Sequence, residues 1–441
     1  MGRGRIVGAG LILLLAACTS TPRHRPADIR IGPEPQIERL AYVSGEQLHI
    51  EEDQLHTDHI VPGIPAAPSH VAWSPDGHWL AFVTGADLTA AGEMTAAYPI
   101  DGRPLWLVNA DGSGAHQVLA SVTQLAWSPT RDQLAAVAGT IATGFTLQLI
   151  DPEARQPTTV AELGEHGTVA WSADGHQLAY SAVRPLAHTG DGPLIARLET
   201  RRLPEGPAVT QITSRGADII VDGWWPDQRG LVYWVDPLFS SSIAADGLPL
   251  YSLPFRGHPH KLAVALPYSD WARIVPGWDL IAVSAGVDRI TWTDKHLELC
   301  PLATGPCTRP PGSDNLPPIT VEAAANPSSR YDPDLAFVAG SARPDSAFGP
   351  KQITQWYATR SLWLFPFTGG NPHRLDVGTG IAAPTWSHGG DRIVYVANGA
   401  LWVTPINHPN PRRLTGAIDV GGSYYGRLDW ADQFAWFTRT S

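Results

Sequence analysis

Lysine and cysteine are scarce in this sequence. The 441 residues contain three lysines and three cysteines, and the formal net charge is −11. So few cysteines exclude a disulfide-rich scaffold, and none lies in a histidine cluster of the kind a zinc site needs. No basic stripe runs along the chain, so we expect no binding to nucleic acid. No motif calls for a cofactor, and we expect none.

Segments with helical periodicity are also essentially absent, and one short phrase recurs instead. Residues 71–82 read VAWSPDGHWLAF, in which two apolar runs flank a tight turn. Pro75 presets the first corner of this turn, and Gly77 accepts the positive φ that other residues resist. The pattern predicts two antiparallel strands joined by a short hairpin.

The phrase recurs along most of the chain. Clear copies start at Leu125, Val169 and Pro384, weaker ones at Asp222, Asp270 and Leu428, and an eroded copy without tryptophan starts at Asn326. These eight copies have a mean spacing of 51 residues. Since one tryptophan in each copy lies where its sheet would pack on the next, we expect these residues in the blade cores: Trp73, Trp127, Trp171, Trp225, Trp271, Trp386 and Trp430.

A period of this length with about four short strands per unit is typical of a β-propeller. We therefore predict an all-β domain over residues 37–441, a single propeller with eight four-stranded blades and with seven blades as the alternative. The first strands lack a tryptophan copy before them, whereas the last copy has little chain after it. We expect the two ends to share one blade.

The first residues predict export. Residues 1–17 have the basic start, short apolar core and small residues of a signal peptide, too short to span a bilayer. Leu15, Ala16 and Ala17 precede Cys18 in a pattern that resembles the lipobox of bacterial lipoproteins, which implies a lipidated Cys18. Residues 18–36 are polar and rich in proline, as in an extended tether.

Three further groups are candidate sites. In an oxidising compartment we expect Cys300 and Cys307 to form a disulfide, with two free thiols as the alternative. The acidic stretch 46–59 contains His49, His56 and His59, weak candidates for metal ligands, although a solvated strand edge explains them better. Residues 421–426, which contain Ser423, only faintly resemble a nucleophile elbow, and we expect no metal and no catalytic residue.

The repeated WSPDG followed by LAF resembles the PD40 (WD40-like) repeat of TolB and related envelope propellers. The chain is also similar to the propeller part of LpqB-type envelope lipoproteins. These resemblances imply a protein-binding scaffold without enzymatic activity, anchored by lipid on the outer side of the cell membrane, with envelope proteins as partners. The alternative is a lactonase, lyase or dehydrogenase with a metal or cofactor on the propeller axis. We expect partners at the variable loops 84–103, 236–248 and 339–360.

Overall fold

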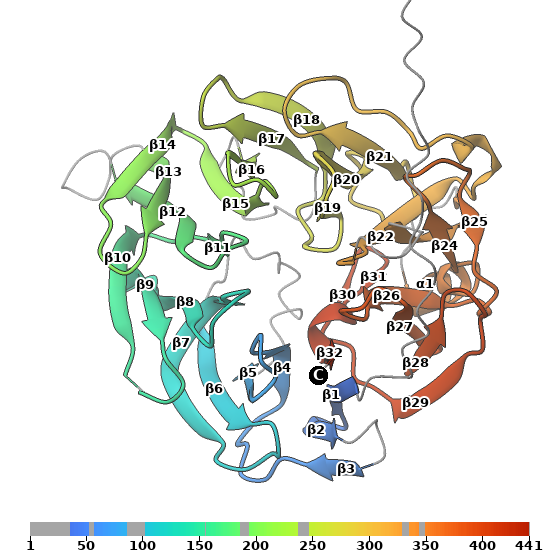
Figure 1. Ribbon diagram of the computed structural model, residues 1–441, viewed down its shortest axis with the longest axis horizontal. Helices are drawn as coiled ribbons and strands as arrows, with labels where there is room; N and C mark the ends of the chain where they lie inside the picture. The colour runs from blue at the N-terminus through green and yellow to red at the C-terminus, as the bar shows by residue number, and fades with distance from the viewer. Residues whose placement is uncertain are drawn as a thin grey trace, which may run out of the picture. The chain divides into compact units, whose positions relative to one another are not determined.

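The computed structural model describes residues 36–52, 57–85, 102–154, 156–185, 194–236, 247–328, 335–343 and 349–440. The chain divides into two units, residues 1–35 and 36–441, and every described residue belongs to the second. This unit is nearly all β, with many small antiparallel sheets that follow one another around a common axis (Figure 1). Residues 18–35 of the predicted tether and most of the loops 84–103 and 236–248 lie outside the described residues, whereas most of the loop 339–360 is described and includes a short helix, residues 350–357.

Both ends of the second unit contribute to one sheet. Its strand order is β3-β2-β1-β32, and β1 pairs with β32 from Gln36 opposite Thr440 to Tyr42 opposite Phe434. The four strands are β1 (Gln36–Ser44), β2 (Gln47–Glu52), β3 (Thr57–Ile60) and β32 (Phe434–Thr440).

The next sheet has eleven strands because two links join successive groups: the long strand β7, and a parallel pairing of β10 with β12 at Gly164 and Val183. The first half of β7 pairs with β6 and its second half with β8. The strands are β4 (Pro68–Trp73), β5 (Trp79–Thr84), β6 (Arg103–Asn109), β7 (His116–Trp127), β8 (Leu134–Thr140), β9 (Gly144–Ile150), β10 (Thr158–Gly164), β11 (Val169–Trp171), β12 (Gln177–Pro185), β13 (Leu194–Arg202) and β14 (Ala208–Arg215).

The remaining sheets continue around the axis. A seven-stranded sheet comprises β15 (Asp218–Trp224), β16 (Gly230–Asp236), β17 (Leu248–Pro254), β18 (His260–Ala265), β19 (Ala272–Val275), β20 (Leu280–Ala285) and β21 (His296–Pro301). Two four-stranded sheets follow: β22 (Ile319–Ala325), β23 (Leu335–Gly340), β24 (Ser361–Phe365) and β25 (His373–Arg374), then β26 (Ile381–Trp386), β27 (Arg392–Ala397), β28 (Ala400–Pro405) and β29 (Arg412–Ala417).

A short hairpin and a few helical turns complete the described residues. The hairpin consists of β30 (Ser423–Tyr424) and β31 (Arg427–Leu428) and lies near the axis (Figure 1). The helical elements are α1 (Pro350–Tyr357) and the 3₁₀ turns η3 (Ser313–Asn315) and η4 (Ala431–Gln433). This nearly all-β arrangement of many sheets agrees with the predicted propeller class.

One cross-strand pair recurs throughout the unit and locates the repeat. In each instance a residue of an inner strand, which is the last one of that strand except at Trp436, faces a leucine or isoleucine on the next strand. The pairs are Trp436 with Leu40, Trp73 with Leu80, Trp127 with Leu134, Trp171 with Leu178, Trp224 with Leu231, Val275 with Leu280, Ala325 with Leu335 and Trp386 with Ile393.

Five of these tryptophans link neighbouring repeats by the same hydrogen bond. Each indole Nε1 donates to the backbone carbonyl that immediately precedes the equivalent residue of the preceding repeat. The donor and acceptor pairs are Trp73 and Ala435 (3.1 Å), Trp127 and Ala72 (3.0 Å), Trp171 and Ala126 (2.8 Å), Trp224 and Ala170 (3.1 Å), and Trp386 and Ala324 (2.9 Å). The bond satisfies the indole N–H, which would otherwise be costly to bury.

In three repeats the residue at the equivalent position differs from the one predicted. The residues at these positions are Trp224, Val275 and Trp436, so the phrases at Trp225, Trp271 and Trp430 were aligned wrongly. Those three tryptophans are nonetheless buried in the largest apolar cluster, together with Trp386. Trp73, Trp127 and Trp171 are half-buried and pack at the edges of three other clusters.

The apolar clusters lie between successive groups of strands. One cluster joins Leu48 and Ile50 of β2 to Leu80 and Phe82 of β5, all fully buried. Removing a side chain of this size from water contributes about 1.5–3 kcal/mol. Each group of strands thus buries its faces against its neighbours, which holds the inner strands in place around the axis.

Candidate functional site

The axis of the unit contains a pocket of about 530 Å³, which we call the axis pocket. Residues from the inner strands β4, β7, β15 and β19 line it, together with residues 267–269 and residues of the segment 427–432. Strand β4 lies across the axis from β15 and β19 (Figure 1). The pocket therefore has opposite walls that belong to repeats far apart in the sequence.

One wall carries two adjoining carboxyl groups. Asp429 lies close enough to Asp432 to feel its charge, and Oδ2 of Asp432 lies 3.0 Å from Nε2 of His70. Burial, reinforced by the charge of Asp432, raises the pKa of Asp429 to about 7. A pair of this kind readily shares one proton because two adjacent carboxylates repel each other.

A buried ion pair supports this wall. The guanidinium of Arg427 lies 3.0 Å from the carboxylate of Asp270 and stacks 4.1 Å from the ring centre of Tyr268. The same guanidinium lies 3.7 Å from Asp429, which is a weaker contact. Since both Arg427 and Asp270 are buried, the charge of Arg427 is already largely balanced without a ligand.

Arg360 and Glu322 form a second buried ion pair. Nη2 of Arg360 is 2.5 Å from Oε2 of Glu322, and the guanidinium lies 4.7 Å from the centre of the Trp356 ring and 4.3 Å from that of Tyr357. The backbone N–H of Ala383 donates to the same carboxylate oxygen, at 2.8 Å. These contacts join successive repeats and hold the inner strands in place.

The opposite wall carries one acid and one base. Asp222 of β15 accepts a hydrogen bond from Nε1 of Trp234 at 3.3 Å, and burial raises the pKa of its carboxyl group to about 6. Arg273 of β19 lines the same pocket, is exposed, and lowers that pKa through its charge. The axis pocket thus presents charges of both signs on facing walls.

A second pocket, of about 720 Å³, lies where the inner strands turn back. Trp73, Trp127, Trp386 and Trp436 are among the residues that line it. Beside them, the carboxyl groups of two successive turns approach each other, and burial followed by the contact with Asp76 raises the pKa of Asp132 to about 6. This pocket is built from the repeat residues themselves, so packing accounts for its lining.

The structure places His49 and His59 on opposite faces of their sheet. His49 of β2 stacks on Tyr42, with 4.7 Å between ring centres, and lies 3.2 Å from Asp58. His59 of β3 pairs with Ile50, so it lies on the other face of the sheet. His56 lies outside the described residues. The weak metal hypothesis at His49, His56 and His59 has no geometric support.

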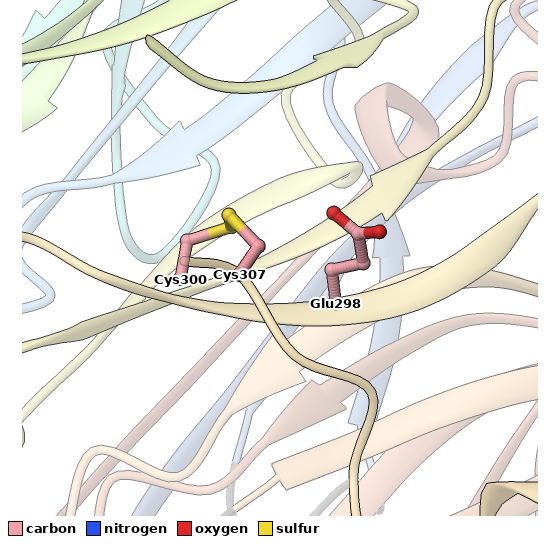
Figure 2. A group of neighbouring side chains, drawn as sticks. All are labelled: Glu298, Cys300 and Cys307. Atoms are coloured by element: carbon pink, nitrogen blue, oxygen red, sulfur yellow. A yellow bond between two sulfur atoms is a disulfide. The ribbon is translucent and has the colours of Figure 1, made fainter. Parts of the chain in front are cut away.

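Only one group of three possible metal ligands occurs among the described residues: Glu298, Cys300 and Cys307. The two sulfur atoms are bonded to each other, as the sequence led us to expect (Figure 2). Figure 2 shows the Glu298 carboxylate beside this disulfide. Because a cysteine binds metal as a thiolate, the oxidised pair offers no metal site.

The remaining sequence candidates contribute nothing to the axis pocket. Ser423 is exposed on β30, and Cys18 lies outside the described residues. Within the part of the chain that the structure describes, no helix has the length and apolar character needed to cross a bilayer. The sequence did not point to Asp222, Asp429 or Asp432 as site residues, because the segments around them differ from the clear copies of the repeat.

Comparisons with known proteins concern the fold. No family model and no curated protein matches the chain. Similar solved structures include a prolyl endopeptidase (TM-score 0.48, 11% identity), dipeptidyl peptidase 4 of Porphyromonas gingivalis (0.49, 11%) and TolB of Acinetobacter baumannii (0.37, 12%). The matches cover 80%, 85% and 88% of this chain. They span 50% and 59% of the two peptidases and 78% of TolB.

The comparisons correct one expectation. From the sequence we expected a protein without enzymatic activity, as in the TolB resemblance. The similar structures also include prolyl, dipeptidyl and acylaminoacyl peptidases, which contradicts that expectation. The identity to these structures is 11–12%, and their TM-scores lie below 0.5.

Proposed function

We propose that this chain is a lipid-anchored β-propeller of the bacterial cell envelope that binds an envelope protein at the mouth of its axis pocket. In this proposal the ring has eight blades, and β1 and β32 close it within one blade. The eight equivalent cross-strand pairs and the pairing of β1 with β32 support this count and this closure.

The proposed location depends on the start of the sequence. Residues 1–17 have the features of an export signal, and the lipobox pattern ends at Cys18. Diacylation of this cysteine would give stable anchoring, since two acyl chains hold a protein where one does not. The similarity to LpqB-type lipoproteins in export signal and lipobox supports the same location.

The axis pocket is the observation that carries the binding role. Function in such folds depends on sites added to a common scaffold. Here the charged residues at the pocket belong to different repeats, and buried ion pairs fix the wall formed by the segment 427–432. A rigid, polar concavity of this size is a usual place for a ligand or a partner segment.

Site-specific photocrosslinking in cells tests the proposal. A photoreactive residue at Ser269, which is exposed and lines the axis pocket, should yield a defined crosslinked envelope protein. The same residue at Ile141, which is 61% exposed on the turn between β8 and β9, is the matched control. Crosslinks that are absent at Ser269, or equal at both positions, would refute partner binding at this mouth.

The carboxyl pair favours a second candidate, an enzyme that uses the axis pocket. A carboxyl group with its pKa raised to about 7, such as Asp429, suits general acid–base catalysis near neutral pH. Screening the full chain against peptides, esters and lactones, with Asp429→Asn and Asp432→Asn as variants, would test this role. Turnover that persists in both variants would exclude the pair.

A further inference from the structure

The strands β12, β13 and β14 bring arginines together at a place remote from the axis pocket. These strands are neighbours in one sheet, and β14 is the outermost of the three (Figure 1). In their registers Arg184 pairs with Ile195, and Ile195 pairs with Arg215. Because paired residues of antiparallel strands project from the same face, both arginines share one face of the sheet with Ile195.

A third arginine joins this face. Arg197 follows Ile195 by two residues on β13, so its side chain projects on the same side. It is a diagonal neighbour of both Arg184 and Arg215, and such neighbours are roughly 7–8 Å apart. All three side chains are exposed. We call Arg184, Arg197 and Arg215 the arginine triad.

The protein does not neutralise the arginine triad. Within the described part of the chain, the side chains of Arg197 and Arg215 take part in no ion pair and no hydrogen bond. Nη2 of Arg184 donates to the backbone carbonyl of Glu162 on β10, at 2.6 Å. This bond holds the guanidinium in place, but a neutral carbonyl leaves its charge uncancelled.

The surrounding face of the sheet is also positive. Arg201 projects from the same face and donates to the backbone carbonyl of Val160. Glu199 is the one carboxylate on the described part of this face of the three strands, and it accepts a hydrogen bond from Thr210 at 3.3 Å. The face therefore carries four arginines and one glutamate.

An anion would remove the repulsion within the arginine triad. Like charges at neighbouring positions of two strands destabilise a sheet, and a guanidinium cannot lose its charge at ordinary pH. The formal net charge of the chain is −11, so the rest of the surface repels anions. Guanidinium groups present paired N–H donors that match the oxygen atoms of a phosphate.

We propose that the arginine triad binds a phosphate group on the outer part of the sheet formed by β12, β13 and β14. The site lies outside the axis pocket, and the inference does not depend on the proposed function. Free inorganic phosphate and the headgroup of an anionic phospholipid share this chemistry, and the experiment separates the two sources.

Isothermal titration of the purified full chain provides the test. The two probes are inorganic phosphate and glycerophosphoglycerol, which is the water-soluble headgroup of phosphatidylglycerol. We expect at least one of them to bind, and the affinity should fall as salt is added because exposed charges are screened. The probe that binds more tightly identifies the source.

Substitutions on the two faces of β13 locate the site. Arg197→Gln and Arg215→Gln should each weaken the better probe by about tenfold, since each removes a charged hydrogen-bond donor. Arg197→Lys should weaken it less, because the charge remains. Arg202→Gln is the matched control: Arg202 is exposed on the same strand but pairs with Gln177 on the opposite face, so the affinity should not change.

Two results would overturn the inference. One is that neither probe binds at millimolar concentration, and the other is that Arg202→Gln weakens binding as much as Arg197→Gln does. The second result would mean that the probe responds to the total charge of the protein and not to the arginine triad. Either result leaves the crosslinking test at Ser269 unaffected.

Discussion

The indole nitrogen of Trp127 donates a hydrogen bond to the carbonyl oxygen of Ala72, 3.0 Å away in the preceding repeat. Ala72 directly precedes Trp73, whose own indole nitrogen bonds in the same way to Ala435. Each tryptophan therefore fixes the distance between two inner strands as well as filling space between two sheets. The strands that line the axis owe their spacing to this repeated contact.

Two substitutions of Trp127 should destabilise the protein by different amounts. Trp127→Phe removes the hydrogen bond and should cost about 1–2 kcal/mol, and Trp127→Ala should cost about 3 kcal/mol because packing is also lost. Chemical denaturation measures both changes. Trp278→Phe, at a position 37% exposed, serves as the control and should cost less than about 0.5 kcal/mol. Equal stability of all three variants and the parent would show that this contact contributes nothing.

The buried pair of Arg427 and Asp270 should show strong coupling. Asp270→Asn or Arg427→Met alone leaves a buried charge unpaired and should cost about 3–5 kcal/mol. The double variant should recover part of this loss, which a double-mutant cycle in denaturant measures. Arg229→Met is the control, since its side chain is 79% exposed and its pair with Asp227 should contribute little. Additive single losses would argue against coupling.

Glu51 should make stability depend on pH. Burial, followed by the charge of Asp58, raises the pKa of Glu51 to about 7 in the folded protein, above its ordinary value of 4.5. The folded state therefore retains this proton longer than the unfolded state, so the stabilisation is complete below about pH 4.5 and is lost as the pH rises through 7.

A neutral substitute tests this dependence. Glu51→Gln should become more stable relative to the parent as the pH rises from 5 to 8, by about 1–3 kcal/mol. Thermal denaturation across this range measures the difference. Glu153→Gln, at an exposed turn position, should follow the parent at every pH. A difference between Glu51→Gln and the parent that does not vary with pH would mean that this carboxyl group titrates normally.

Cys18→Ser should release the protein from the membrane. A serine cannot accept the thioether-linked lipid that the lipobox resemblance implies, and the remaining chain has no stretch of sufficient apolar length after residue 18. Fractionation of cells with an antibody against the protein measures the distribution. Continued recovery in the membrane fraction would contradict lipid anchoring, whereas the parent protein should shift only after detergent treatment.

The sequence predicted the sheets better than the exact repeat positions. The clear copies around Trp73, Trp127 and Trp171 all have alanine before the tryptophan, and the backbone carbonyl of this alanine accepts the hydrogen bond from the next indole. Trp436 also follows an alanine. This signal would have placed the last repeat at Trp436 instead of Trp430.

The repeat in the middle of the chain was misaligned for a related reason. Pro226 follows Trp224 by two residues, as Pro75 follows Trp73, so the turn residues favour Trp224 over Trp225. Only the paired strands decide between adjacent tryptophans. At Val275 no tryptophan exists, and the buried Trp271 was mistaken for the repeat residue.

The axis pocket could not be predicted from local patterns. His70 has a positive φ of 53°, and the strand register shifts between Ser69 and Ala72. The side chain of His70 therefore does not follow the regular alternation of side chains between the two faces of a strand. Asp432 reaches it from a position more than 360 residues later in the sequence. A contact between a bulge and a distant 3₁₀ turn depends on how the sheets come together, which periodicity alone does not specify.

The pairing of β1 with β32 imposes an order on biosynthesis. While the chain is being made, the edge of β1 that faces the axis has no partner until residues 434–440 have been added. Every earlier sheet can form in sequence, but the one that contains β1 must wait for the final few residues. The nascent protein therefore carries an unprotected strand edge for almost the whole of its synthesis, and its last residues remove that hazard.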